Sequence, residues 1–195
     1  MKNVLLIPIF FLALTVCAEA KTAKKGASVN SSSEVIYLAG GCFWGVEDLL
    51  RKIPGVTETR VGYMGGDTKN ATYNLVKTGA TNHAETVQIT FDPKKLKLDD
   101  LLLYFFKIHD PTTPNQQGND IGTQYRSVIF YTTDKQKDEA EIIKQRVDKS
   151  GAWKKPLVTQ IVKAPEFWDA EDYHQDYLQK NPNGYTCHYE RKLNF

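Results

Sequence analysis

Residues 33–55 read "SEVIYLAGGCFWGVEDLLRKIPG", and this stretch predicts a strand, a turn and a helix in direct succession. Its first part is rich in β-branched and apolar residues and ends in glycines, which is typical of a buried strand. Apolar side chains then recur at the spacing of one helical face, at Phe43, Val46, Leu50 and Ile53. Pro54 and Gly55 end the helix. Cys42 is therefore expected at a strand-to-helix turn.

The surroundings of Cys42 suggest a reactive thiol. A helix N-terminus directs free N–H groups and partial positive charge at the residue placed there, which favours thiolate over thiol. The neighbouring glycines leave space for the approach of a substrate. Aromatic residues beside a helix start usually belong to the core, and Phe43 lies on the apolar stripe. Trp44 lies off that stripe, so we expect it to line a small apolar pocket that would hold a methyl or methylene group.

The first twenty residues form a predicted secretory signal peptide, residues 1–20. Met1-Lys2 precedes the apolar run "VLLIPIFFLALTV", and Ala18-Glu19-Ala20 has the small-x-small form of a cleavage site. The run is too short for a confident membrane span. We expect cleavage after Ala20 and an exported protein, periplasmic or extracellular. The alternative is a lipoprotein signal with Cys17 as the acylated residue.

The rest of the chain divides into a linker and one domain. Residues 21–33, "KTAKKGASVNSSS", are polar and lack an apolar period, so they are predicted to be a flexible linker. Residues 34–195 are long enough for one domain with a sizeable core. The net charge of the chain is +2 and its lysines are scattered without a basic stripe, so nucleic-acid binding is not expected.

Two cysteines, Cys42 and Cys187, remain after the predicted cleavage. In an oxidising compartment, their number alone favours a structural disulfide that joins the two ends of the domain. A zinc site is not expected, because the chain has no CxxC motif and its four histidines lack ligand spacing.

The segment "NHAETVQITFD", residues 82–92, contains a candidate acid. Apolar and polar residues alternate along it, which predicts a half-buried strand with a polar outer face. Glu85 has the parity of the buried residues. In an apolar pocket, burial would raise its pKa and make it a general acid near neutral pH; at a solvated strand end it would pair with a lysine instead.

The second half of the chain predicts a buried helix, a long loop and a mobile tail. The segment "LDDLLLYFFKIHD" reads as the helix, and "PTTPNQQGNDIGTQYRS" as a loop long enough to be functional. Asp120 and Tyr125 are candidates there, although a turn residue and a strand-entry aromatic would look the same. A strand "RSVIFYTT", a surface helix "TDKQKDEAEIIKQRVDKSG", a strand "LVTQIVKA" and a short helix near "DAEDYHQDYLQKN" follow. The tail "PNGYTCHYERKLNF" has no apolar anchor pattern.

These segments resemble one family. "GGCFWGVE" is similar to the active-site signature of the type A peptide methionine sulfoxide reductases, and the similarity covers most of the chain after Ser33. It continues in order through "PGV", "VGYMGG", "TYNLV", "HAETVQITFDP", "HDPTTPNQQGNDIGTQYRS", "AEDYHQDYL" and "NPNGY". The resemblance implies an α+β fold, a ferredoxin-like two-layer α/β sandwich with a mixed sheet, long loops and an irregular C-terminal tail.

The resemblance also implies a reaction. Cys42 attacks the sulfoxide sulfur of an oxidised methionine, Glu85 protonates the sulfoxide oxygen, and Cys42 becomes a sulfenic acid. The substrate is the S epimer, in proteins and also as the free amino acid. The resemblance gives roles to five further residues. Tyr73 and Tyr125 would donate hydrogen bonds to the sulfoxide oxygen, and Phe43 and Trp44 would form the pocket for the ε-methyl group. Asp120 would be a polar residue that shapes the site.

The recycling step would use Cys187 as the resolving thiol. Family members often read Gly-Tyr-Cys there, whereas Thr186 stands between Tyr185 and Cys187 in this chain, which leaves the register of the tail open. The resemblance implies electrons from a thioredoxin-like protein or another thiol donor, without a metal or prosthetic cofactor. We also expect a monomer. Two other classes remain open: a non-catalytic secreted domain stapled by a Cys42–Cys187 disulfide, and a secreted thiol peroxidase or oxidoreductase.

Overall fold

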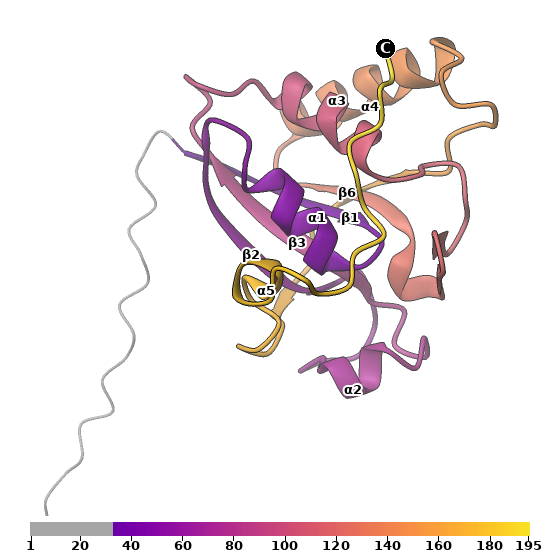
Figure 1. The fold of residues 1–195 in the computed structure, drawn as a ribbon. Helices are drawn as coiled ribbons and strands as arrows, with labels where there is room; N and C mark the ends of the chain where they lie inside the picture. Colours follow the sequence, from indigo (N-terminus) through magenta and orange to yellow (C-terminus); the bar gives the residue numbers. More distant parts are fainter. Residues whose placement is uncertain (1–32) are drawn as a thin grey trace, which may run out of the picture.

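The computed structural model describes residues 33–195 (Figure 1). The predicted signal peptide with its cleavage after Ala20, the alternative acylation at Cys17, and the linker up to residue 32 lie outside the described residues. Within the part that is described, no helix combines the length and the apolar composition needed to cross a membrane.

A mixed sheet of six strands is the centre of the fold, in the order β7-β6-β1-β3-β2-β8. The pair β6 and β7 is parallel, and every other neighbouring pair is antiparallel. A separate two-stranded sheet, β4 and β5, lies in the long loop. The strands are β1 (Glu34–Gly40), β2 (Val56–Met64), β3 (Ala84–Phe91), β4 (Gln116–Gln117), β5 (Asp120–Ile121), β6 (Ser127–Tyr131), β7 (Gln160–Lys163) and β8 (Phe167–Asp169).

Helices cover one face of the large sheet, as the predicted α+β sandwich requires (Figure 1). The helices of this layer are α1 (Phe43–Leu50), α3 (Leu98–Ile108) and α4 (Asp134–Lys149). The short helices α2 (Tyr73–Val76) and α5 (Tyr177–Lys180) and a 3-10 turn, η1 (Thr123–Tyr125), complete the helical elements of the described residues. The predicted strands and helices at β1, α1, β3, α3, β6, α4 and β7 are confirmed. The predicted helix near α5 is only four residues long, and β2, α2 and β8 were not expected from the sequence pattern.

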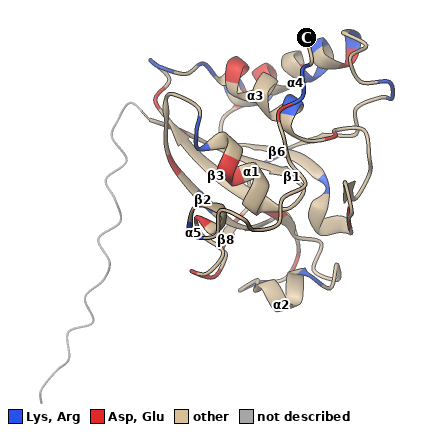
Figure 2. Cartoon of the chain, viewed as in Figure 1, with Lys and Arg blue, Asp and Glu red and all other residues tan. Residues whose placement is uncertain are grey.

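Charged side chains of both signs are interspersed over the helices and loops, without a face of one sign in the view of Figure 2. On α4, for example, Lys135 lies 3.6 Å from Glu139, and Lys137 lies 3.8 Å from Glu141. Exposed pairs of this kind contribute about 0–1 kcal/mol each to stability. The apolar core therefore carries most of the stability of the fold.

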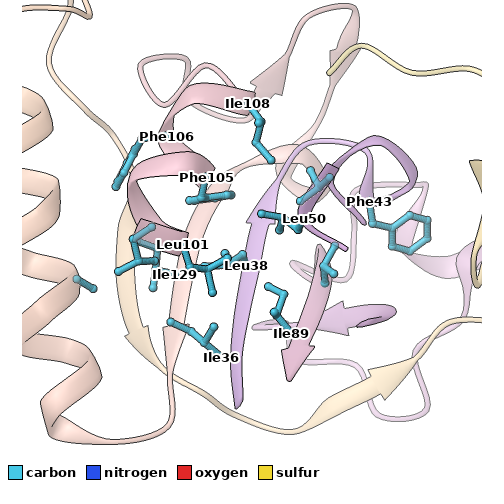
Figure 3. Close-up of a cluster of buried hydrophobic side chains, with 14 of the residues drawn as sticks. Ile36, Leu38, Phe43, Leu50, Ile89, Leu101, Phe105, Phe106, Ile108 and Ile129 are labelled. Atoms are coloured by element: carbon cyan, nitrogen blue, oxygen red, sulfur yellow. The ribbon is translucent and has the colours of Figure 1, made fainter. Parts of the chain in front are cut away.

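That core lies between the sheet and helices α1, α3 and α4 (Figure 3). Alternate residues of β1 and β3 point into this core. Leu38 of β1, for example, pairs with Val87 of β3, and both side chains are fully buried. Burying one such side chain stabilises the fold by about 1.5–3 kcal/mol. The same alternation places Glu85 on the helix-facing side, two residues before Val87.

The polar face predicted for β3 is not solvent-exposed. Thr86 is fully buried and Thr90 is only 9% exposed. The reason is a second, smaller apolar cluster on this side of the sheet, made of Ala39, Met64, Ala84, Val128 and Phe130. Both faces of the central strands are covered, and the alternation of polar and apolar residues did not show this.

The C-terminal tail runs across α1 and ends beside α4 (Figure 1). The amide of Arg191 donates to the carbonyl of Lys107 at 3.2 Å, and Arg146 donates to the carbonyl of Phe195 at 2.8 Å. His188 is only 6% exposed. The prediction of a tail without an anchor was wrong, because a buried polar ring and backbone hydrogen bonds hold it in place of an apolar pattern.

Candidate active site

Cys42 lies where the sequence placed it, at the N-terminal cap of α1 and after the end of β1. Its side chain makes no capping hydrogen bond. Instead, Glu85 Oε2 on β3 accepts a hydrogen bond from the Phe43 amide at 3.1 Å. The first amides of a helix have no partner within the helix. Glu85 therefore satisfies one of them, which fixes the carboxyl group beside Cys42.

Glu85 has the properties of a general acid. It is 3% exposed, and burial raises its pKa to about 8, with a further contribution from Asp120 and an opposing one from the Phe43 amide. At neutral pH the carboxyl group is therefore mostly protonated and can donate its proton. No lysine within residues 33–195 forms an ion pair with it. Of the two environments considered for Glu85, the structure shows the buried one.

The expectation of a thiolate at Cys42 was wrong. Burial raises the pKa of the Cys42 thiol well above its usual range, and the Glu85 carboxylate raises it further. The Trp44 amide at the helix start lowers this pKa, as expected, but burial outweighs it. The side chain is 6% exposed, so the resting group is a thiol. Protonation of Glu85 removes its own contribution to this rise in pKa.

One pocket, with a volume of about 130 Å³, unites the predicted residues. Seven of the eight predicted residues line it, and Tyr185 is the lining residue that was not predicted. The lining is Cys42, Phe43, Trp44, Tyr73, Glu85, Asp120, Tyr125 and Tyr185. These residues come from the α1 start, α2, β3, β5, η1 and the tail. A larger cavity of about 560 Å³, lined by charged residues such as Arg51 and Glu58, contains no cysteine.

Two tyrosines supply hydroxyl groups to the pocket. Tyr73 and Tyr125 are half-buried, and burial raises the pKa of each, so both hydroxyls stay protonated. Within residues 33–195, neither hydroxyl is hydrogen-bonded to another residue. They are free to donate to an acceptor bound beside Glu85.

A histidine that sequence reasoning missed supports the aromatic wall. His174 is 1% exposed, and its Nδ1 accepts a hydrogen bond from Trp44 Nε1 at 3.0 Å. Its ring lies 4.5 Å from the ring of Tyr73, centroid to centroid. Trp44 also stacks on the ring of Tyr177, with ring centroids 3.7 Å apart. The segment "AEDYHQDYL" thus orients Trp44, and its place among the family blocks was the only available signal.

The glycines near Cys42 make room for protein atoms and not for substrate, contrary to expectation. A Cβ at Gly40 would lie 2.9 Å from the ring of Phe105 on α3. At Gly41, where φ is +105°, it would lie 2.5 Å from Gln117 Cγ. At Gly45 it would overlap Thr186 and His188 of the tail. The "GGCFWG" motif therefore allows α3, the long loop and the tail to pack closely on the helix start.

Cys187 is outside the pocket lining but contacts one of its residues. Its Sγ lies 3.4 Å from Asp120 Oδ2, and Tyr185 donates to Asp120 Oδ1 at 3.2 Å. Burial raises the pKa of Cys187 to about 11, and Asp120 raises it as well. Both Cys42 and Cys187 are free thiols, so the structure does not contain the disulfide that counting alone favoured. The described residues include no group of three side chains placed to hold a metal ion.

Comparison with known proteins supports the same reading of the chain. The family model described as peptide methionine sulfoxide reductase matches residues 34–194. "Peptide methionine sulfoxide reductase MsrA 1" of Mesorhizobium japonicum is 55% identical over 161 residues, which are 83% of this chain and 91% of that protein. The enzyme of the same name, MsrA, from Pseudomonas fluorescens is 53% identical, over 83% of this chain and 75% of its own length.

Solved structures with this fold are similar too. Mxr1 from Saccharomyces cerevisiae in reduced form has a TM-score of 0.79 at 41% identity, over 83% of this chain and 93% of that one. Methionine sulfoxide reductase A of Corynebacterium diphtheriae has a TM-score of 0.76 at 40% identity, over 80% and 79%. The match extends over nearly all described residues and includes the pocket around Cys42. The chain therefore belongs to the peptide methionine sulfoxide reductase family.

Proposed function

We propose that this protein reduces methionine S-sulfoxide at the pocket around Cys42, as a peptide-methionine (S)-S-oxide reductase. Its family membership establishes the coarser activity, the thiol-dependent reduction of methionine sulfoxide. One observation carries the assignment to this pocket. A buried thiol, Cys42, and a buried carboxyl group with a pKa of about 8, Glu85, share a small aromatic cavity.

The lining gives each part of the substrate a separate place. The ε-methyl group packs against Phe43 and Trp44, and the sulfoxide oxygen lies toward Glu85 and the two tyrosine hydroxyls. The volume of about 130 Å³ suits the end of one side chain and not a whole peptide. This favours the same binding mode for free and protein-bound methionine sulfoxide. A peroxide has no methyl group for the aromatic wall, which argues against a general thiol peroxidase.

The first step transfers the oxygen to Cys42. Its sulfur forms a bond to the sulfoxide sulfur and releases the thiol proton to solvent, from which Glu85 is later reprotonated, while Glu85 donates its own proton to the oxygen. The oxygen then passes with this proton to the Cys42 sulfur, as the S–O bond of the substrate and the new S–S bond both break. Methionine leaves with the electron pair of the S–S bond, and Cys42 becomes a sulfenic acid. The hydroxyls of Tyr73 and Tyr125 donate hydrogen bonds to the oxygen as negative charge develops on it.

The second step resolves the sulfenic acid through Cys187. Attack of its thiol on Cys42 forms a disulfide and releases water, and a thioredoxin-like donor then reduces the disulfide. The contact of Cys187 with Asp120 supports this role, because Asp120 also lines the Cys42 pocket. The yeast relative Mxr1 has been solved in complex with Trx2, which supports a thioredoxin-like donor for this chain.

A count of methionine formed per enzyme tests the activity. Reduced protein, freed of excess reductant, is mixed separately with methionine S-sulfoxide and R-sulfoxide. We expect about one methionine per enzyme from the S epimer and none from the R epimer, because the methyl group, the oxygen and the chain have separate places. If neither epimer yields methionine, the proposed reaction is wrong.

We propose in addition that the enzyme is exported and repairs exported proteins. This rests on the predicted signal peptide at residues 1–20 and requires a thiol donor outside the cytoplasm. The mass of the exported protein tests it, with Lys21 as the expected first residue. An acylated protein that begins at Cys17 would support lipoprotein anchoring instead, and an uncleaved cytoplasmic protein would contradict export.

A further inference from the structure

The C-terminal tail places an imidazole ring against the Cys187 thiol. His188 Nδ1 lies 3.5 Å from Cys187 Sγ, which is within hydrogen-bonding distance for sulfur. The ring is buried, with 6% of the residue exposed. The two-step reaction described above assigns no role to this ring. A buried, titratable group in contact with a reacting sulfur therefore calls for a chemical explanation.

The hydrogen bond on the other side of the ring defines its tautomer. His188 Nε2 lies 2.7 Å from the carbonyl oxygen of Gly40, two residues before Cys42. A carbonyl oxygen only accepts, so Nε2 carries the hydrogen and donates it. Burial lowers the pKa of His188, so the ring is neutral at pH 7. Its Nδ1 then has a free lone pair, and this lone pair faces the Cys187 thiol.

Four titratable or charged groups act on His188. Arg191 of the tail lowers its pKa, Asp120 of β5 raises it, and Cys187 is in direct contact. The fourth is His109, at the end of α3, whose pKa burial lowers to about 3 and which therefore carries no charge at neutral pH. Asp120 Oδ2 also lies 3.4 Å from Cys187 Sγ. The carboxylate can thus stabilise an imidazolium ion, but it is also a competing acceptor for the thiol hydrogen.

We infer that His188 is a catalytic base of the resolving step, in which its Nδ1 takes the proton of Cys187 as this thiol attacks the sulfenic acid of Cys42. The inference rests on the proposed function, in which Cys187 is the resolving thiol. The new bond is the Cys42–Cys187 disulfide, and the bond that breaks is the S–O bond of Cys42. Hydroxide takes a proton from solvent and leaves as water, while His188 returns its proton to solvent. One sulfenic acid and one thiol give one disulfide and one water, without an external oxidant.

The resolving step needs a base because the Cys187 thiol seldom ionises at neutral pH. Its pKa of about 11 lies four units above pH 7, so only about one molecule in ten thousand would carry the thiolate. The thiolate is the form that attacks sulfur. A base that accepts the proton while the S–S bond forms makes the reaction independent of this small fraction.

The pH dependence of disulfide formation in the first turnover tests the inference. The full protein is reduced, mixed with one equivalent of methionine S-sulfoxide, and quenched with acid; methionine and the Cys42–Cys187 disulfide are measured separately. The two time courses together give the rate constant of the step from sulfenic acid to disulfide, and we expect this rate constant to be nearly constant from pH 7 to pH 9 in the parent protein. In His188→Gln the rate should be about a hundredfold lower at pH 7 and should rise about tenfold per pH unit.

Glutamine is chosen because its amide can still donate to the Gly40 carbonyl while it offers no titratable base. Tyr189→Phe is the matched control, since Tyr189 is the next residue and is 60% exposed; it should retain the parent profile. The parent profile is informative even if His188→Gln does not fold. A parent rate that rises tenfold per pH unit would overturn the role of His188.

Three further outcomes would also reject the inference, and they have different meanings. If His188→Gln retains the parent rate and the flat profile, another group, with Asp120 as the nearest, takes the proton. If the parent forms no methionine, the proposed function fails and the role of His188 fails with it. If methionine forms without a Cys42–Cys187 disulfide, Cys187 is not the resolving thiol.

Discussion

The two cysteines of the site are held in opposite ways. Cys42 lies between a strand and a helix that follow each other directly in the sequence, and its position is defined by residues 33–55. Cys187 is positioned by distant residues. Its contact with Asp120 joins residues 67 positions apart, and the His188–Gly40 hydrogen bond beside it joins residues 148 positions apart.

The difference shows that local sequence places Cys42, whereas tertiary contacts place Cys187. A buried strand, a glycine turn and an amphipathic helix follow one another in residues 33–55, and together they fix the position of the residue at the turn. The place of the second thiol depends on how the tail packs, and two glycines near Cys42, Gly41 and Gly45, permit this packing. Changes at Cys42 should therefore abolish chemistry, whereas changes around Cys187 should affect recycling alone.

The largest expected effect is that of Cys42→Ser. A serine hydroxyl keeps the size of the side chain but does not attack sulfur as a thiol does, so methionine formation should fall to background. Methionine is measured by chromatography after a single turnover, and circular dichroism checks the fold. Methionine formation by this variant would show that the nucleophile lies elsewhere and would break the contrast between the two cysteines.

Glu85→Gln should give the next largest effect. It keeps the shape of the side chain but removes the transferable proton, so methionine formation in the first turnover should slow by about a hundred- to ten-thousandfold. In the parent, this rate should fall as the pH rises through about 8, the pKa of Glu85, because the protonated form is the active one. The variant should lack this fall. An unchanged rate constant would contradict the assignment of Glu85 as the acid.

The stability of Glu85→Gln provides an independent check. The folded-state pKa of Glu85 lies above its ordinary value of 4.5, so the native protein binds the proton more tightly than the unfolded chain does. The stability contributed by this proton is fully present below about pH 4.5 and is lost as the pH rises through about 8. Thermal unfolding should therefore show a steeper loss of stability between pH 5 and pH 8 in the parent than in the variant.

Cys187→Ser should separate recycling from the first chemical step. The variant should release about one methionine per enzyme and leave Cys42 as a sulfenic acid that a dione reagent can trap. Its multiple turnover with a thioredoxin-like donor should fall strongly, while a small thiol should restore part of it. Turnover as fast as that of the parent with the protein donor would mean that Cys42 works without Cys187.

The smallest effect is expected for Gly45→Ala, which tests the packing of the tail. The added methyl group would overlap Thr186 and His188. Alanine favours the helical conformation, so α1 itself should not be weakened. The side chains of Thr186 and His188 must shift to admit the methyl group, at a cost of about 1 kcal/mol. This shift should slow disulfide formation about three- to tenfold, while methionine release should be unchanged and serves as the internal reference. An equal slowing of both steps would indicate that the tail also supports the Cys42 pocket.

Much of the fold could be predicted because its long elements have strong periodic patterns. The strand β1, the helices α1, α3 and α4, and the alternating strand β3 all follow from apolar spacing. The segments α2 and β8 were missed, since four and three residues are too few for a period to show. The nine-residue strand β2 was missed as well, because its first residues are largely exposed and its last four are all buried, so no single period runs along it. Tertiary contacts stabilise the two short elements. For example, the Tyr73 amide at the start of α2 donates a hydrogen bond to the Glu171 carboxylate at 2.9 Å.

The composition of the site shows the same division. Sequence pattern alone indicated Cys42, Trp44 and Glu85, and the family resemblance added Tyr73. The sequence pattern did not indicate Tyr185 or His174. Both residues reach the site from the C-terminal part of the chain, and neither belongs to a segment with a periodic pattern.

The sequence by itself determined the strand-to-helix turn at Cys42 and the inward parity of Glu85, because both depend on residues a few positions apart. Only the tertiary structure decided the protonation states. Burial keeps Cys42 a thiol, although the Trp44 amide at the helix N-terminus lowers the pKa of that thiol, and burial also raises the pKa of Glu85 to about 8. Only the tertiary structure placed His188 between Gly40 and Cys187. Burial and hydrogen bonds across 148 positions depend on the whole packed chain, and no local pattern of residues encodes them.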